Sequence, residues 1–319
     1  MKKCLSYLFA IFTILSAHTN NLAYNHSPIG VMGDHMHSKG EWMVSYRYMT
    51  MDMEGLLQGS SDISSNSLLN INSMTAGDFD MAPTKMSMNM QMFGAMYAIS
   101  DKWTLMGMLN HLDNEMDMVM AMGAMRMPMS MNAKSSGLGD LKLAGLYDIA
   151  RWDSGRRIHF NLGWSLPTGS IEKKHDGNIL GYGMQLGSGT WDFHPAITYL
   201  AQTDNYSYGT QLGGIFRIGE NDQDYTLGDK LEATIWGARK ITDSLSASVK
   251  FDFSSQNEVD GEHKGLTAMQ KMMSPGNQAT SQGRDLTTFG LGLNYYFQEG
   301  GLDGHRLAVE WETPIDQKV

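Results

Sequence analysis

The chain has 319 residues, enough for one large barrel or two ordinary domains. Its formal net charge is −10 and no cluster of Lys or Arg stands out, so we expect no nucleic-acid partner. The mean hydropathy is −0.31, and no run of about 20 apolar residues follows the N-terminal region, so no membrane-spanning helix is predicted.

The N-terminus has the pattern of a secretory signal peptide. Two lysines precede an apolar run from Leu5 to Leu15, and a polar stretch ending at Ala23 follows. The apolar run is too short to span a bilayer as a helix. Residues 1–23 are therefore predicted to direct export and to be removed, with cleavage near Ala17 or Ala23.

Cleavage would leave a chain without thiol chemistry, because Cys4 is the only cysteine. Residues 24–41 are then predicted to form a periplasmic N-terminal segment, and residues 42–319 the main domain. Gly is frequent, at 35 residues, and together with many Tyr, Trp and Ser it favours a β-protein.

From Trp42 onward, apolar and polar residues alternate with period two in one segment after another, as they do in β-strands with two different faces. The pattern is clearest where Ile158, Phe160 and Leu162 alternate with His159 and Asn161. The predicted strands cover residues 42–53, 84–98, 103–118, 138–149, 158–166, 188–200, 206–218, 230–240, 245–253, 285–297 and 306–312.

The connections between these strands alternate between long and short, including a long one over residues 120–137. This alternation predicts an antiparallel transmembrane β-barrel, with tight turns on the periplasmic rim and long loops outside. Because the first connection is long, strand one runs outward from the periplasm. A soluble periplasmic β-protein is the alternative.

Eleven strands are visible, whereas about 12 are expected, because bacterial barrels normally have an even count. The chain reaches Val319 one strand early. Either the count misses a strand or the chain is truncated at its C-terminus.

Methionine is the most skewed residue, with 28 in the chain and sixteen of them from Met81 to Met131. Many stand in Met-x-Met runs, which place every thioether on one face of a strand. They could bind a soft ion such as Cu(I) or Ag(I), fill space, or line an apolar ligand site. Asp34, His35, Met36 and His37 would add N, O and S ligands. The candidate metal ligands are Met86, Met88, Met90, Met92, Met116, Met118, Met120, Met122, His35 and His37.

Charged and histidine side chains on the polar face of the strands are predicted to line the lumen. His159, Asp192 and His194 lie on neighbouring strands, and Arg47 and Lys250 share the same face of their own strands. They could form a polar constriction, or simply line a wet interior. We find no G-x-S-x-G, metalloprotease helix or phosphate-binding loop, so an enzyme is not expected.

Three short stretches carry a family resemblance: Ser136–Asp140 before strand four, Leu166–Ser170 after strand five, and Gly187–Asp192, with Pro195, opening strand six. With these motifs, the chain from about Gly40 onward is similar to the outer-membrane proteins grouped as the MetA-pathway of phenol degradation family. The resemblance implies an outer-membrane barrel in a Gram-negative-type bacterium that acts as a transporter, with uptake of aromatic compounds suggested for some members.

The predicted function is therefore a channel for passive passage of a small, hydrophobic or aromatic solute, with outer-membrane lipid as its surroundings. A Met-rich envelope protein that binds or passes Cu(I) is the alternative. No other cofactor is expected.

Overall fold

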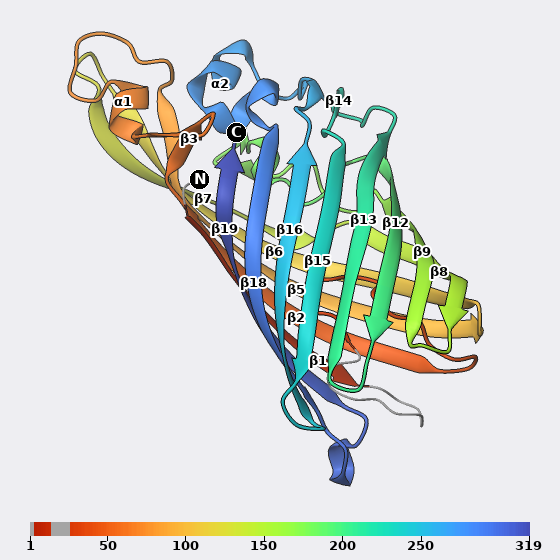
Figure 1. The fold of residues 1–319 in the computed structure, drawn as a ribbon. Coiled ribbons are helices and arrows are strands. Elements are labelled where there is room, and N and C mark those ends of the chain that lie inside the picture. The colour runs from red at the N-terminus through yellow and green to blue at the C-terminus, as the bar shows by residue number, and fades with distance from the viewer. Residues whose placement is uncertain (1–2, 14–25) are drawn as a thin grey trace.

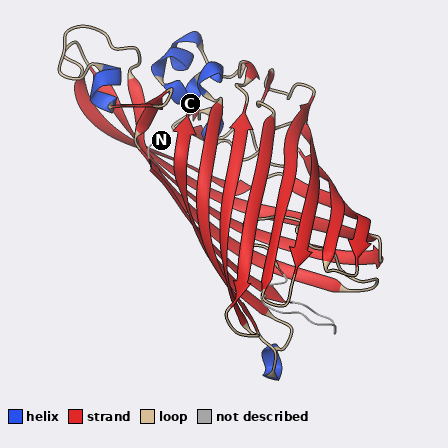
Figure 2. Ribbon diagram, in the orientation of Figure 1, coloured by secondary structure: helices blue, strands red, loops and turns tan. Residues whose placement is uncertain are grey.

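The computed structural model describes residues 3–13 and 26–319, which form a closed antiparallel β-barrel (Figures 1 and 2). The barrel strands are β1 (Lys3–Thr13), β2 (Trp42–Glu54), β5 (Met81–Ser100), β6 (Trp103–Met122), β7 (Met127–Leu138), β8 (Leu141–Trp152), β9 (Arg156–Leu166), β12 (Trp191–Gln202), β13 (Tyr206–Ile218), β15 (Lys230–Lys240), β16 (Leu245–Gln256), β18 (Arg284–Tyr296) and β19 (Arg306–Lys318).

The barrel closes because β5 and β6 pair with each other and so join the two ends of the row of strands, although β7 pairs with β6 alone. β6 pairs with β5 on one side, and on the other side it pairs with β7 along its outer half and with β8 along its inner half. β7 and β8 thus occupy one wall position together, and both run from the rim with the long loops toward the rim with the tight turns. β1 lies antiparallel between β2 and β19, so the thirteen strands of the sheet fill twelve wall positions.

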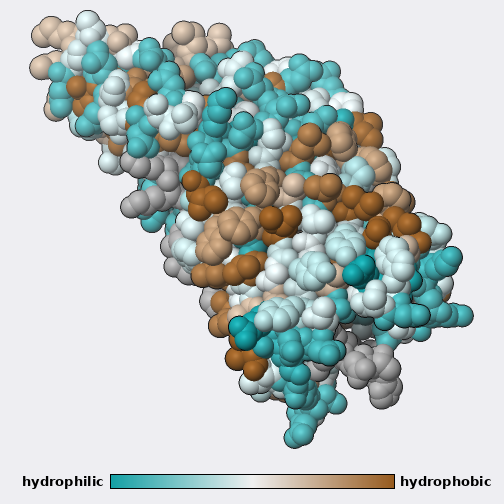
Figure 3. All heavy atoms as spheres, viewed as in Figure 1, coloured by the Kyte–Doolittle hydropathy of each residue, from teal (hydrophilic) through white to brown (hydrophobic). Residues whose placement is uncertain are grey.

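The two faces of the wall have opposite chemistry, and this confirms the predicted faces of the strands. On β9, Phe160 and Trp164 are exposed on the outside, whereas His159 and Asn161 are buried inside. An apolar band crosses the middle of the molecule between hydrophilic ends (Figure 3). A water-soluble protein is polar outside and apolar inside, and this arrangement is the reverse. It is stable in lipid, where the closed barrel pairs the backbone groups of its strands and the outer side chains contact acyl chains.

Loop lengths sort by rim as the sequence predicts. The long connections at one rim carry β3 (Leu56–Gln58), β4 (Ser61–Ile63), α1 (Ser65–Leu69), β10 (Lys174–His175), β11 (Asn178–Ile179), η2 (Tyr182–Met184), β14 (Tyr225–Thr226), β17 (Asp260–Gly261), α2 (Ala268–Met273), η3 (Pro275–Asn277) and η4 (Ala279–Ser281). The opposite rim has tight turns, apart from η5 (Gly300–Leu302) between β18 and β19. No helix in the described part of the chain is long and apolar enough to cross a membrane, a finding that does not bear on strands.

The predicted loop over residues 120–137 is wrong. Residues 127–138 form β7, which continues the Met-x-Met alternation as a hairpin with β6. The chain reverses at the hairpin tip, where Gly123 and Arg126 have positive φ angles of 69° and 47°. The methionine run alternates as a strand does, but the short turn that lets it pair with β6 has no clear turn motif in the sequence.

The predicted twelfth position is filled from the N-terminus. Residues 3–13, which lie in the predicted signal peptide, form β1, and the rest of that peptide lies outside the described residues. The eleventh predicted strand is also longer than expected, since β19 continues through Pro314 to Lys318.

Candidate functional site

A segment of chain occupies the interior of the barrel. Residues 26–37, which we call the plug, lie within the segment predicted to be periplasmic, and the structure places them against the inner wall. Nearly all of them are buried. Their contacts reach strands on every side of the barrel, so the plug is held across the lumen.

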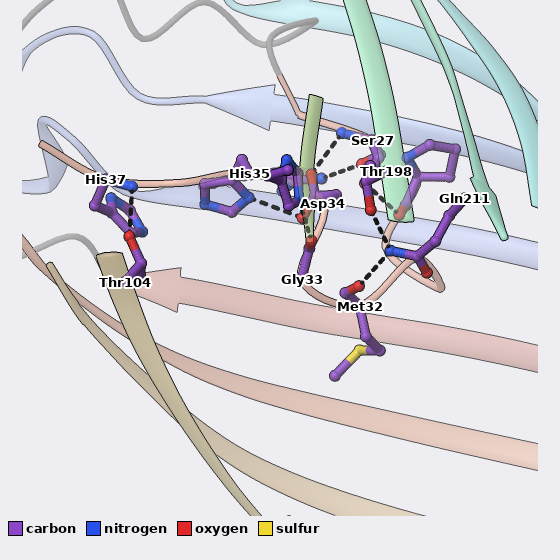
Figure 4. A network of polar contacts seen from close by, with 12 residues as sticks. Ser27, Met32, Gly33, Asp34, His35, His37, Thr104, Thr198 and Gln211 are labelled. Atoms are coloured by element: carbon purple, nitrogen blue, oxygen red, sulfur yellow. Dashed lines mark hydrogen bonds and ion pairs between the residues drawn. The ribbon is translucent and has the colours of Figure 1, made fainter. Parts of the chain in front are cut away.

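The plug's backbone is held mainly by polar side chains of the wall (Figure 4). His159 Nε2 and Asn161 Nδ2 lie 2.9 and 3.0 Å from the carbonyl oxygen of Gly33. Gln211 Nε2 donates to the carbonyl of Met32 at 3.0 Å, and Thr104 Oγ1 accepts from the backbone N–H of His37 at 3.2 Å. Since buried backbone groups must find partners, these contacts define one position for the plug.

Two glycines let the plug approach the wall this closely. Gly33 has a φ of +61°, and a Cβ there would lie 2.8 Å from Asn161 Nδ2. A Cβ on Gly30 would lie 2.8 Å from Glu310 Oε1. Larger residues at either position would force the plug away from the wall.

Apolar plug side chains pack into separate wall clusters. Ile29 and Met36 share a buried cluster with Met43, Met96 and Leu146. Val31 packs elsewhere, against Leu200 and Trp236. The plug is therefore fixed by apolar burial as well as by hydrogen bonds.

A cluster of charges holds the plug at Gly30. Lys250 Nζ lies 2.6 Å from Glu310 Oε1, 2.9 Å from Asp252 Oδ2 and 3.1 Å from Glu312 Oε2. The backbone N–H of Gly30 donates to Glu310 Oε2 at 3.2 Å. One buried ammonium thus balances several carboxylates at the point where the plug touches β16 and β19.

The structure brings together three of the five predicted lumen residues. Arg47, His159 and Lys250 all lie at the plug, Arg47 through a contact from its guanidinium to the sulfur of Met32. Asp192 is buried but instead pairs with Arg217. His194 is only partly buried, and its Nε2 has no hydrogen-bond partner among the described residues.

Methionines line one side of the inner wall between the plug and the long loops. Met86 is buried, whereas Phe93, on the opposite face of β5, is exposed, so the even-numbered methionines of β5 point inward. Met92 packs beside the cluster that contains the plug's Ile29 and Met36. Higher on the wall, methionines of neighbouring strands lie opposite one another, in the pairs Met49–Met90, Met51–Met88, Met53–Met86 and Met86–Met116.

A cavity of about 880 Å³ lies among the long loops, at the outer end of this methionine wall. Met116, Met118 and Met120 line it from β6, but the predicted Met122 is exposed at the hairpin tip and does not. The loops complete the cavity with further apolar side chains, among them Leu57, Phe79, Leu180, Met184, Met269 and Met273. This concave, largely apolar space suits a small apolar ligand.

The three stretches that carry the family resemblance meet below this cavity. Asp140, at the junction of β7 and β8, accepts the N–H groups of Gly169 and Ser188, both at 2.8 Å, and the Ser188 hydroxyl at 3.2 Å. One buried carboxylate therefore ties both ends of the loop over residues 167–190 to the wall. The three stretches therefore hold the loop to the wall.

We expect Asp140→Ala to destabilise the barrel by about 2–4 kcal/mol, because it leaves buried N–H groups of the loop without an acceptor. Urea unfolding in lipid vesicles, followed by tryptophan fluorescence, measures the change. Asp153→Ala, in an exposed turn, is the control and should change little. Equal stability of the two variants would show that Asp140 does not hold the loop.

The chain was compared with known protein families, sequences and structures. Residues 91–307, more than half of the chain, match the family described as MetA-pathway of phenol degradation. No curated protein sequence matches.

Several solved structures are similar over nearly the whole chain. An outer-membrane channel from Pseudomonas putida F1 is 12% identical, covering 98% of this chain and 96% of that one, with a TM-score of 0.48. A FadL homologue from Pseudomonas aeruginosa is 9% identical, covering 99% and 89%, with a TM-score of 0.38. A variant of the TodX monoaromatic hydrocarbon channel is 8% identical, covering 99% and 88%, with a TM-score of 0.37.

Proposed function

Because the chain belongs to the MetA-pathway of phenol degradation family, we propose that it is an outer-membrane channel for a small apolar solute, such as a monoaromatic compound. Its role is passage without catalysis, and its apolar outer band contacts membrane lipid. The carrying observation is the methionine wall, which joins the apolar cavity among the loops to the plug.

The methionine wall gives an apolar solute a surface to follow inside a barrel whose inner wall also carries many polar and charged side chains. A porin lumen is polar and filled with water, which disfavours apolar solutes. Methionine is flexible and polarizable, so it adapts to ligands of different shape and contacts aromatic rings favourably. The cavity would collect the solute and the wall would guide it toward the plug, whose displacement opens the way to the periplasm.

The Cu(I) alternative gains no support from the methionine packing. Met92 packs beside an apolar cluster, and Met116, Met118 and Met120 line a cavity shared with leucine, isoleucine and phenylalanine side chains. These surroundings fit an apolar role, although binding of Cu(I) by the methionine runs stays a prediction.

Introducing a charge into the cavity tests the proposal. We expect Met118→Asp to weaken binding of phenol by about 10- to 100-fold, because the solute would have to lie against a hydrated carboxylate. Equilibrium binding of radiolabelled phenol to the detergent-solubilised chain gives the affinity.

Met122→Asp is a matched control, since it places the same charge on the same strand but outside the cavity. It should bind phenol like the unaltered chain. If both variants bind phenol as the unaltered chain does, the cavity is not the binding site.

A further inference from the structure

We propose that the plug contains a binding site for a divalent transition-metal ion of the zinc class, formed by His26, Asp34 and His35. One potential ligand atom from each of these residues lies within 4.8 Å of those of the other two, and it is the one such group found among the described residues. The three residues come from the two ends of the plug loop, so an ion there would join those ends.

The side chains of this cluster are buried, and several of their ring nitrogens have no hydrogen-bond partner among the described residues. His26, Asp34 and His35 are only 5%, 4% and 6% exposed. Both ring nitrogens of His26 and the Nε2 of His35 have no hydrogen-bond partner among the described residues. A buried imidazole without partners is costly, and a metal ion would satisfy the free lone pair of His26.

The contacts of Asp34 prepare the ligands. Its Oδ1 lies 2.8 Å from His35 Nδ1, so one ion placed between His26 and this pair could be bound by both atoms. Its Oδ2 accepts the backbone N–H of Ser27 at 3.0 Å, which fixes the carboxylate next to His26.

The histidine rings are close enough to share an ion. The ring centroids of His26 and His35 are 4.7 Å apart, and those of His35 and His37 are 4.9 Å apart. His37 Nε2 is also without a hydrogen-bond partner among the described residues, so His37 is available as a further ligand.

The donor set selects the class of ion. Two imidazoles and a carboxylate suit Zn²⁺ and its borderline neighbours, whereas Cu(I) prefers the thioethers of the methionine wall. The sequence pattern predicts His35 as a ligand for a soft ion, but the structure groups it with nitrogen and oxygen donors and adds His26.

The ion would lock the plug. The loop that it closes, residues 26–35, holds Gly30, Met32 and Gly33, which contact Glu310, Arg47 and His159 of the wall, respectively. If only the docked plug presents the complete site, a free ion concentration of 100 times its Kd raises the ratio of docked to undocked plug about 100-fold.

Metal binding can be measured on the full chain in detergent, purified without a histidine tag and stripped with a chelator. After incubation with Zn²⁺ and desalting, we expect the chain to retain a single equivalent of zinc. Co²⁺ should give visible absorption bands of a low-symmetry site. His26→Gln and His35→Gln should each lower zinc affinity by more than about tenfold, while His305→Gln, in the connection between η5 and β19, should leave it unchanged.

Heat-modifiable gel migration shows that each variant still forms the barrel, whose wall contains none of the three ligands. Absence of retained zinc in the unaltered chain would overturn the proposal, as would equal zinc affinity in His26→Gln, His35→Gln and His305→Gln. Because the readout is binding, failure of the transport proposal would leave this result standing.

Discussion

Deleting residues 27–37 is expected to raise the single-channel conductance of the barrel by about tenfold or more, because the plug holds the lumen of a barrel wide enough to carry water once emptied. The wall should survive the deletion. Its strands are joined to one another by backbone hydrogen bonds that do not involve the plug. Planar-bilayer recordings measure the conductance, and heat-modifiable migration reports the folded wall.

A deletion outside the lumen serves as the control for the deletion of the plug. Shortening the β18–β19 connection around η5 (Gly300–Leu302) removes residues from the tight-turn rim without touching the plug. It should leave the conductance low. If both deletions gave the same conductance, the plug would not be what closes the channel.

Lys250→Met is expected to destabilise the barrel by about 3–5 kcal/mol, because it leaves carboxylates buried without a cation. Lys250 is 4% exposed and Glu310 2%, and their charged atoms lie 2.6 Å apart. Asp252 and Glu312 would then face Glu310 without compensation. Urea unfolding in lipid vesicles gives the free energy of unfolding.

Lys85→Met is the matched control. Lys85 also faces two carboxylates, on Asp52 and Glu54, but both at 3.9 Å, and its side chain is 44% exposed. Its removal should cost about 1 kcal/mol or less. Adding Glu310→Gln to Lys250→Met should recover part of the lost stability. If Lys250→Met were no more destabilising than Lys85→Met, the cluster would not stabilise the wall.

The strands and their faces could be predicted because period-two alternation is a local property of the sequence. His159 and Phe160 face opposite ways in any strand that contains both, whatever its partners. The inward orientation of Lys250 and Arg47 follows from the same alternation of residues, whereas the class of fold and the rim of each loop follow from the alternating lengths of the connections.

The plug could not be predicted in this way, because its position depends on contacts far apart in the sequence. Nothing periodic marks residues 26–37, and Gly30 meets Glu310 across 280 positions. His26 was missed for the same reason, since it stands alone in the sequence and joins Asp34 and His35 only when the plug folds back. Nothing in the sequence around Gln211 indicates that its side chain holds the backbone of Met32.

Residues 3–13 have two incompatible assignments. The sequence indicates the apolar part of a signal peptide, and the structure pairs these residues as β1 with both β2 and β19. Cleavage near Ala17 or Ala23 would remove β1 and leave β2 and β19, which run in the same direction, to close the wall. An odd strand count does occur in a mitochondrial barrel. N-terminal sequencing of the chain isolated from outer membranes decides between the two.

Uptake of a radiolabelled monoaromatic hydrocarbon across the outer membrane of intact cells tests the central claim most directly. Cells that produce the unaltered chain should take up the aromatic compound several-fold faster than cells without it, and cells with Met118→Asp should fall between them, as expected for a route through an apolar cavity. Glycerol uptake should be the same in all three. Equal uptake of the aromatic compound in all three strains, or a rise for glycerol alone, would contradict a channel for apolar solutes.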